Sequence, residues 1–378
     1  MMRAIIGTPS VSSTNPRYDQ SNLPIIHLLT DWLENIGFSV EVQPLVDPRK
    51  ANLIATIGPV HPGAEGLILS GHTDTVPFDQ QQWQHDPFKL VEKDNKFFGL
   101  GSTDMKSFFA LAIDAACKFK QADFKRPLTI LATADEESAM TGAQALQKKQ
   151  LQHAKYAIIG EPTNLTPIRM HKGVMMESLT VTGHAGHSSN PNLGASATEG
   201  MHKVINELLR WRDELQTKHQ NPVFDVASPT MNIGSIHGGD NPNRICSHCE
   251  TQIDIRPLPG MNINDLRADL QKRLANVLPE ESKLKLAYKP IFCGVPPFET
   301  AVNAKLTRTI EQLINKPSEA VAFGTEAPYL NNLGIETIVI GPGSIDQAHQ
   351  ANEFISSAQI QPYSSFLQKI IKNICLGR

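Results

Sequence analysis

Three short apolar runs in the first half of the chain constrain the fold more than any other feature of the sequence. They are GLILSG (66–71), LTILATA (128–134) and YAIIGE (156–161). Each is short and bounded by polar or turn residues, as expected of strands that are covered on both faces of a parallel sheet. Helical patterns accompany them, over residues 21–38 and from Asp104 to about Gln121. The sequence therefore predicts an α/β domain with a mostly parallel sheet flanked by helices.

The pattern changes from about Lys172 and then returns. MMESLTVTG, TMNIGSIHGG and CETQIDIRPLPG are rich in β-forming residues, and two long helical patterns separate them. After KLKLAYKP the first pattern resumes, with two helices and the strand-like run ETIVIGPG. We expect residues 173–288 to form a smaller α+β domain with an antiparallel sheet, inserted into a first domain made of residues 1–172 and 289–378.

Composition excludes several classes of function. The 378 residues are 40% hydrophobic, and 35 basic residues nearly balance 38 acidic ones, which is unlike a nucleic-acid or anionic-membrane binder. A small-molecule partner is therefore expected. The chain lacks an apolar stretch long enough to span a bilayer and shows no secretory leader pattern, so we expect a cytoplasmic protein.

The five cysteines are an odd and sparse set, which favours reduced thiols over a disulfide framework. Cys246 and Cys249 form a CxxC, but no second pair of ligands follows at the spacing of a structural zinc site. Ordinary thiols are the favoured interpretation, with a metal or redox site as the alternative.

Several acids and imidazoles stand where an apolar run gives way to a loop. They are His72, Asp104, Glu136, Glu137, Glu161 and His349. In open α/β sheets the carboxyl ends of the strands meet at one edge, so these side chains can converge. Because clustered buried carboxylates repel one another, their convergence requires compensating cations, and two divalent metals with mixed histidine and carboxylate ligands would supply them.

Two short stretches suggest distinct roles within such a centre. In SGHTDTVPF, Asp74 is placed to accept the second ring N–H of His72 and so to orient the imidazole as a metal ligand. The alternative for these residues is a polar turn at a strand end. In ATADEES, the adjacent glutamates point in different directions, so Glu137 is assigned as a metal ligand and Glu136 as the general base. The alternative for the second stretch is an acidic helix start.

Ordered blocks across nearly the whole chain are similar to a known family. SGHTDTVPF, FFGLGSTDMKSFFA, ILATADEES, IIGEPT and VIGPGSIDQAHQANEF resemble the dinuclear zinc aminohydrolases that include acetylornithine deacetylase, succinyl-diaminopimelate desuccinylase, aminoacylases and carboxypeptidases. The resemblance implies that Asp104 bridges two divalent metal ions, with zinc expected and cobalt as the alternative, and that a cis peptide follows it. His72 and Glu161 would complete one metal site, and Glu137 and His349 the other.

The resemblance also assigns residues beyond the metal centre. His187, in HAGHSSNPNLG, would cross a homodimer interface to stabilise the oxyanion of the partner subunit's reaction, with a surface loop or a third metal site as alternatives. Asn243 and Arg256 would meet the substrate. In FGTEAPYL, we expect Thr325 to cap a helix, and the free N–H groups near Gly324 and Thr325 to hold a substrate carboxylate.

The activity that the resemblance implies is removal of the acetyl group from N2-acetyl-L-ornithine, giving L-ornithine and acetate in arginine biosynthesis. A succinyl-diaminopimelate desuccinylase and a broad aminoacylase or dipeptidase are the nearest alternatives. A non-catalytic amino-acid-binding homologue is a third, disfavoured because all five ligand positions and Glu136 are retained.

Overall fold

The computed structural model describes residues 1–377, which fold into two compact units. Unit 1 comprises residues 1–169, 300–319 and 325 onward, and unit 2 comprises residues 170–299 and 320–324. The insertion expected over residues 173–288 lies within unit 2. Among the described residues, no helix is both long and apolar enough to cross a membrane.

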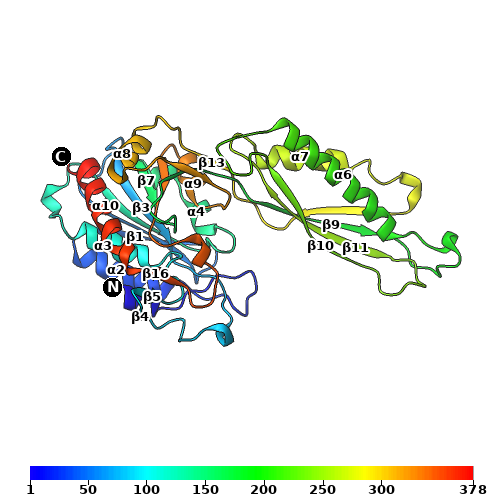
Figure 1. Cartoon of the computed structure of the whole chain (residues 1–378), viewed down its shortest axis with the longest axis horizontal. Coiled ribbons are helices and arrows are strands. Elements are labelled where there is room, and N and C mark those ends of the chain that lie inside the picture. Colours follow the sequence, from blue (N-terminus) through cyan, green and yellow to red (C-terminus); the bar gives the residue numbers. More distant parts are fainter. Residues whose placement is uncertain (378) are drawn as a thin grey trace. The chain divides into compact units, whose positions relative to one another are not determined.

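The largest sheet has nine strands and a parallel centre (Figure 1). Its hydrogen-bonded order is β1-β2-β6-β3-β7-β15-β8-β13, and β14 pairs with β8. The strands β6, β3, β7 and β15 are parallel to their neighbours in this group, whereas β1 and β2 on one side and β8 and β13 on the other pair antiparallel. The bounds are β1 Ser39–Pro44, β2 Ala51–Ile57, β3 Gly66–His72, β6 Leu128–Thr133, β7 Ala154–Ile159, β8 Ile168–His171, β13 Phe298–Glu299, β14 Glu319–Val321 and β15 Glu336–Val339.

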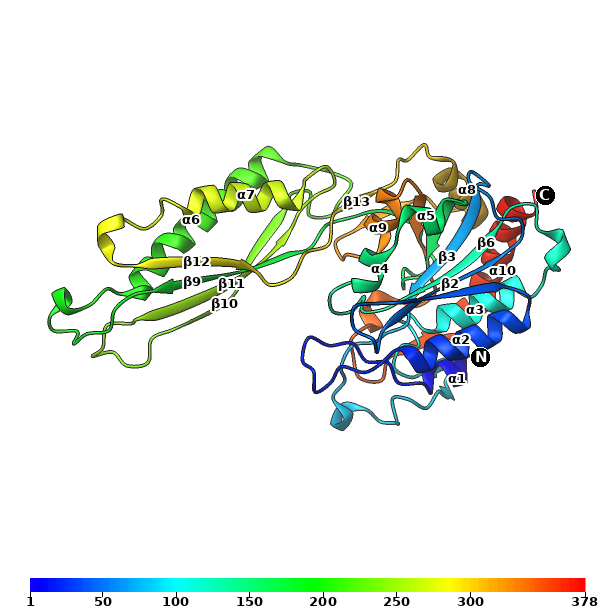
Figure 2. The ribbon, with the colours of Figure 1, turned by 180° about the vertical axis from the view of Figure 1, so that it is seen from behind.

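Burial explains why the central strands are apolar along their whole length. Every residue of β3 and β6 is buried, which is the pattern of strands covered on both faces. The helices α3 and α10 lie side by side in both views and contribute to one apolar core with these strands (Figure 2). The prediction of a mostly parallel sheet flanked by helices is therefore confirmed. The helices of unit 1 are α1 Met2–Ile6, α2 Leu23–Asn35, α3 Ser107–Ala116, α4 Thr141–Ala145, α5 Lys148–Leu151, α8 Lys305–Ile314, α9 Ala327–Asn332 and α10 Ser357–Cys375.

The helix expected from Asp104 to about Gln121 is shorter than predicted at both ends. It begins at Ser107 because the backbone amides of the preceding turn bond to the carboxylate of Glu353. It ends at Ala116, and its ten residues are almost all buried. A small sheet in the order β16-β5-β4 (Phe354–Ser356, Lys96–Phe98 and Val91–Lys93) joins the segment after Glu353 to the segment before this turn.

Unit 2 contains a four-stranded antiparallel sheet in the order β10-β11-β9-β12, with bounds Thr230–Gly238, His248–Arg256, Met175–Thr182 and Lys285–Pro290. The helices α6 (Ala197–Lys218) and α7 (Ile263–Leu274) cover one face of it (Figures 1 and 2). Trp211 of α6 is fully buried in the core of this unit, and its indole N–H donates to Asp269 of α7 at 2.8 Å. The expected antiparallel sheet is confirmed.

Candidate metal centre

Three neighbouring parallel strands end at one edge of the sheet and deliver the polar residues that the sequence singles out. β3 ends at His72, β6 ends just before the segment 135–137, and β7 ends just before Glu161. Because β3 pairs in parallel with both β6 and β7, these three ends are adjacent. The carboxyl edge of such a sheet is where α/β proteins bind their ligands.

The first group of ligand atoms comes from His72, Asp104 and Glu161, all of them buried. The ring nitrogen Nε2 of His72 lies 3.0 Å from Asp104 Oδ1 and 3.8 Å from Glu161 Oε1. Oε1 of Glu161 is buried without a hydrogen-bond partner in the described part of the chain. A cation held by this group would give that orphaned oxygen a partner, so these residues fit a metal ion.

The second group comes from Asp104, Glu137 and His349, and it shares Asp104 with the first. Nε2 of His349 lies 3.0 Å from Glu137 Oε2 and 3.5 Å from Asp104 Oδ2. His349 adopts a left-handed backbone conformation, with φ of 59°, in the loop that follows β15. The two oxygens of one aspartate therefore face two separate histidines, which is the arrangement of a carboxylate that bridges two cations.

The electrostatics of the centre are those of a surplus of carboxylates. Burial, together with the neighbouring carboxylates, raises the pKa of Glu161 and of Glu136 well above the ordinary value. Burial acts against ionisation of Asp104 as well, but hydrogen bonds to His349 and His72 hold the pKa of Asp104 below its ordinary value. Hydrogen bonding to Asp104 and Glu137 raises the pKa of His349 to about 10. Positive charge is therefore favoured at this centre, from protonated imidazoles or from cations.

The expected cis peptide is present between Asp104 and Met105. We expected the carboxylate of Asp74 to accept the second ring N–H of His72, but the structure differs. Nδ1 of His72 lies 3.0 Å from the backbone oxygen of Asp74 and 3.7 Å from its carboxylate. The carboxylate instead accepts the backbone N–H groups of Glu136, at 3.3 Å, and Glu137, at 3.1 Å. Asp74 thus orients the imidazole through its main chain and fixes the glutamate pair through its side chain.

The segment 135–137 is a turn and not the start of a helix, since α4 begins at Thr141. Glu136 is partly exposed, and Glu136, Glu137 and His72 form a third group of ligand atoms within reach of one another. A glutamate beside the ligand cluster, whose pKa is raised by burial, has the properties of a general base or acid.

The remaining predicted residues lie apart in sequence and mostly in unit 2. His187 is exposed, and its Nδ1 accepts hydrogen bonds from the backbone N–H and the hydroxyl of Ser189. Asn243 is exposed, and its backbone oxygen accepts the N–H of Ser188, which places Asn243 beside the His187 loop. Arg256 ends β11 and forms an ion pair with Asp254 at 3.0 Å.

Gly324 and Thr325 stand at the boundary of the two units. Thr325 does not occupy the N-cap position: α9 begins at Ala327, and Glu326 is its N-cap. The hydroxyl of Thr325 still accepts the N–H of Ala327 at 3.1 Å, so it satisfies one donor of the helix start from one position earlier. The prediction of the cap was therefore wrong by one residue.

Sequence reasoning missed two buried glutamates that influence this centre. Glu353 accepts the backbone N–H groups of Gly101, Thr103 and Asp104, and so holds the loop that presents Asp104. Glu326 bonds to Thr133 at 2.8 Å, and burial raises its pKa to about 7. Glu353 lies in HQANEF and Glu326 in GTEAPYL. Glu353 precedes a strand and Glu326 is five residues beyond one, so neither stands directly at a strand end, and only their positions near other motifs could have marked them.

The five cysteines are free thiols, as expected. Cys246 is partly exposed and its thiol contacts the backbone oxygen of His248 at 3.0 Å, whereas Cys249 is buried in β11. Within the described residues, neither belongs to a group of possible metal ligands.

The chain is similar to known proteins over nearly its whole length. A family model described as "Peptidase family M20/M25/M40" matches residues 68–373. The chain is 47% identical over 378 residues to an acetylornithine deacetylase of Pasteurella multocida, covering all of this chain and 98% of that protein. It is 46% identical to an acetylornithine deacetylase of Proteus mirabilis, covering all of this chain and 96% of that protein.

Solved structures share the fold at lower identity. A metallo-carboxypeptidase of the M20 family from Sulfolobus solfataricus matches with a TM-score of 0.76 and 16% identity, over 98% of this chain and 97% of that chain. A dinuclear metal-binding peptidase of the same family from Bacillus subtilis matches with a TM-score of 0.67 and 13% identity, over 99% and 97% of the two chains.

Proposed function

This chain belongs to peptidase family M20/M25/M40, and from that premise we propose that it is a dinuclear metallohydrolase that converts N2-acetyl-L-ornithine to L-ornithine and acetate. The observation that carries the reaction class is the sharing of Asp104 between two groups of ligand atoms. The substrate rests on the curated relatives at 44–47% identity, which are named acetylornithine deacetylases. We propose the cytoplasm and arginine biosynthesis as its setting on the same ground.

Five residues would hold the two divalent cations, which we propose are zinc, with cobalt able to replace it. His72 and Glu161 would complete one site, Glu137 and His349 the other, and Asp104 would bridge them. Bound cations would polarise the acyl carbonyl and lower the pKa of a nucleophilic water. The mixture of nitrogen and carboxylate ligands suits zinc, and the orphaned oxygen of Glu161 supports a ligand role for that residue.

Glu136 is the proposed general base. Its raised pKa suits a group that takes a proton from the attacking water and then gives it to the leaving amine. Its backbone is fixed because the carboxylate of Asp74 accepts the N–H groups of Glu136 and Glu137. Holding the main chain fixes the point from which the Glu136 side chain extends, which supports the orientation that proton transfer needs.

Residues of unit 2 would act on the substrate. We propose a homodimer in which His187 of the partner subunit donates a hydrogen bond to the oxyanion, with unit 2 as the dimerisation and lid domain. Asn243 and Arg256 are proposed to contact the substrate, since a guanidinium at a strand end can bind both oxygens of a carboxylate. Gly324 and Thr325 are proposed as further contacts to that carboxylate.

The test is release of free amine by the purified protein from N2-acetyl-L-ornithine, N-succinyl-diaminopimelate and N-acetyl-methionine. Each substrate is assayed with chelator and with added zinc or cobalt. Metal-dependent preference for acetylornithine supports the full proposal, while preference for another substrate keeps the reaction class and replaces the substrate. Glu136→Gln is the matched variant, because it should retain metal and lose most turnover, and activity near that of the unaltered protein would exclude Glu136 as the base.

A further inference from the structure

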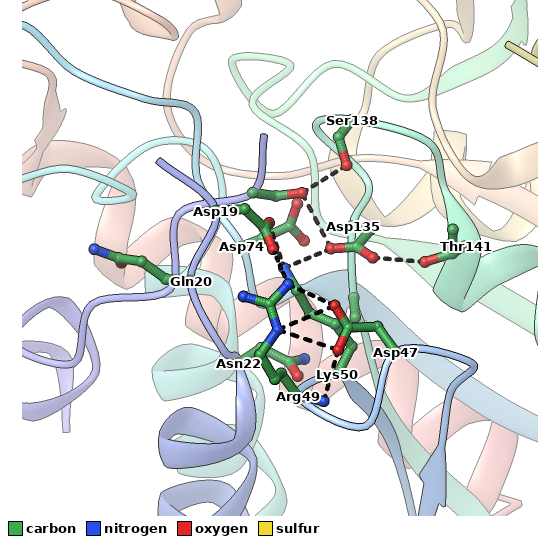
Figure 3. A network of polar contacts seen from close by, with 12 residues as sticks. Asp19, Gln20, Asn22, Asp47, Arg49, Lys50, Asp74, Asp135, Ser138 and Thr141 are labelled. Atoms are coloured by element: carbon green, nitrogen blue, oxygen red, sulfur yellow. Dashed lines mark hydrogen bonds and ion pairs between the residues drawn. The ribbon is translucent and has the colours of Figure 1, made fainter. Parts of the chain in front are cut away.

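A buried ion-pair network includes Asp135, the residue that precedes the proposed base (Figure 3). Lys50, the residue before β2, is only 2% exposed, and its ammonium lies 2.8 Å from Asp135 Oδ1 and 2.9 Å from Asp19 Oδ1. Burial opposes the charge, but hydrogen bonds to these two carboxylates raise the pKa of Lys50 above its ordinary value. A buried lysine that stays charged is held by its partners, so the three side chains form one unit.

Asp135 is fixed at every one of its polar acceptors. Besides Lys50, its carboxylate accepts the hydroxyls of Ser12, at 3.1 Å, and Thr141, at 2.7 Å. Its backbone oxygen accepts the N–H groups of Met140 and Ala139. Asp135 also has φ of 59°, a left-handed conformation that a residue other than glycine adopts at a cost and keeps only where its surroundings hold it.

The position of Asp135 sets the position of the two glutamates that follow it. Asp74 contacts their amides, but it is separated from them in sequence and offers only two hydrogen bonds, at 3.3 and 3.1 Å. The covalent attachment on the other side is Asp135 itself, in the conformation that its carboxylate contacts maintain. Of these contacts, the one with Lys50 pairs opposite charges inside the protein, where hydrogen bonds between charged groups are strongest.

Resting on the proposed function, we propose that Lys50 is a positioning residue for Glu136. Its ammonium holds the carboxylate of Asp135, keeps the turn 135–140 in one conformation, and so directs the Glu136 side chain at the attacking water. Lys50 does not touch the reacting atoms. Its effect on the reaction passes through the backbone of the turn.

The test compares Lys50→Met with Arg49→Met as the matched control. Arg49 contacts the same Asp19, at 2.8 Å, but its side chain is half-exposed and its ion pairs are with Asp19 and Asp47 and not with Asp135. With saturating metal, Lys50→Met should lower kcat on acetylornithine by about 10- to 100-fold and leave KM within about twofold, because substrate binding is not altered. Arg49→Met should stay within about twofold of the unaltered protein in both parameters.

A second background separates positioning of the base from general loss of structure. In Glu136→Gln, adding Lys50→Met should leave the residual kcat within about twofold, since the group that Lys50 positions is already absent. If the two losses multiply, Lys50 acts independently of Glu136 and the proposal is overturned. Asp135→Asn tolerates the left-handed conformation and removes the charge opposite Lys50, while the hydroxyl that meets its amide nitrogen can accept instead of donate. It decides the question by the same measurements if Lys50→Met does not fold.

Amide hydrogen exchange over residues 136–140 gives a readout that needs no substrate. We expect exchange at Ala139 and Met140 to be at least about tenfold faster in Lys50→Met and unchanged in Arg49→Met. If the unaltered protein releases amine from none of the substrates, the proposed function fails while exchange still reports on the turn. If exchange and kcat both match the unaltered protein in Lys50→Met or, failing that, in Asp135→Asn, the role of Lys50 is refuted.

Discussion

The contact between Glu353 and the loop of Asp104 allows a quantitative prediction about metal affinity. Glu353 is 2% exposed; its Oε1 accepts the N–H groups of Thr103, at 2.6 Å, and Asp104, at 3.0 Å, and its Oε2 accepts that of Gly101 at 2.9 Å. Glu353→Gln keeps the shape but has a single acceptor oxygen. The amide nitrogen would then face the N–H of Gly101, donor against donor.

An unpaired buried N–H costs about 1–3 kcal/mol, so we take about 2 kcal/mol for this substitution. If that cost falls on the conformation that presents Asp104 to the cations, affinity for the more weakly bound metal should fall about 30-fold, since about 1.4 kcal/mol corresponds to a tenfold change. Thermal unfolding of the metal-free protein should also occur at a lower temperature.

The assay is titration of the metal-free protein with zinc or cobalt against a competing chelator. Glu92→Gln, an exposed glutamate of β4, is the control and should leave the affinity unchanged. Burial raises the pKa of Glu353 to about 8, so both proteins are titrated above that pH, where Glu353 is the carboxylate that its three N–H donors favour. Unchanged metal affinity and unchanged stability in Glu353→Gln under these conditions would refute the reasoning.

Three further predictions follow from burial, metal linkage and the proposed dimer. Burial lowers the pKa of His171 to about 4, so between pH 6.5 and 4 the unfolded chain binds a proton at His171 that the folded chain does not bind. The free energy of unfolding should therefore fall by at most about 3 kcal/mol over this range. In urea unfolding, His171→Phe should lose less stability between these pH values than the unaltered protein, and an equal loss would contradict the assignment. Chelation should lower the free energy of unfolding by about 4 kcal/mol from its value at free metal a thousandfold above Kd, and calorimetry that shows the same Tm with and without metal would argue against a folding-linked site. His187→Ala should lower kcat less than Glu136→Gln, and an equal mixture of the two variants should regain up to about a quarter of full activity through mixed dimers, whereas no recovery would mean that His187 acts within its own chain.

Sequence patterns were sufficient to predict the central strands, because their burial is visible in the type of each residue. The strands that end at His72, before Asp135 and before Glu161 are apolar because both faces of the sheet are covered, and that burial is visible as uninterrupted apolar letters. The convergence of their polar ends followed from the geometry of parallel strands. Adjacent glutamates after a strand likewise indicated two roles without any knowledge of their surroundings.

Local patterns failed where long-range hydrogen bonds replaced local ones. The helix expected from Asp104 begins three residues later because Glu353, far along the chain, binds the amides of the preceding turn. The carboxylate of Asp74 turned to the amides of Glu136 and Glu137 instead of the neighbouring imidazole. In each case a buried carboxylate accepts the backbone N–H groups that the folded chain places nearest to it. The distance between acceptor and donor in the folded chain cannot be deduced from their spacing in the sequence.

The sequence by itself determined which residues are candidates for metal binding and catalysis, since the apolar periodicity of the chain predicts the order of strands and helices and the polar residues at the strand ends. Only the tertiary structure decided how those residues are held. Lys50 lies 85 positions before Asp135, and Glu353 lies 249 positions after Asp104, so neither pairing has a local signal. The physical reason is that a buried charge is stabilised by whichever partner the folded chain places within hydrogen-bond distance, and that choice is made by the packing of the sheet and its loops.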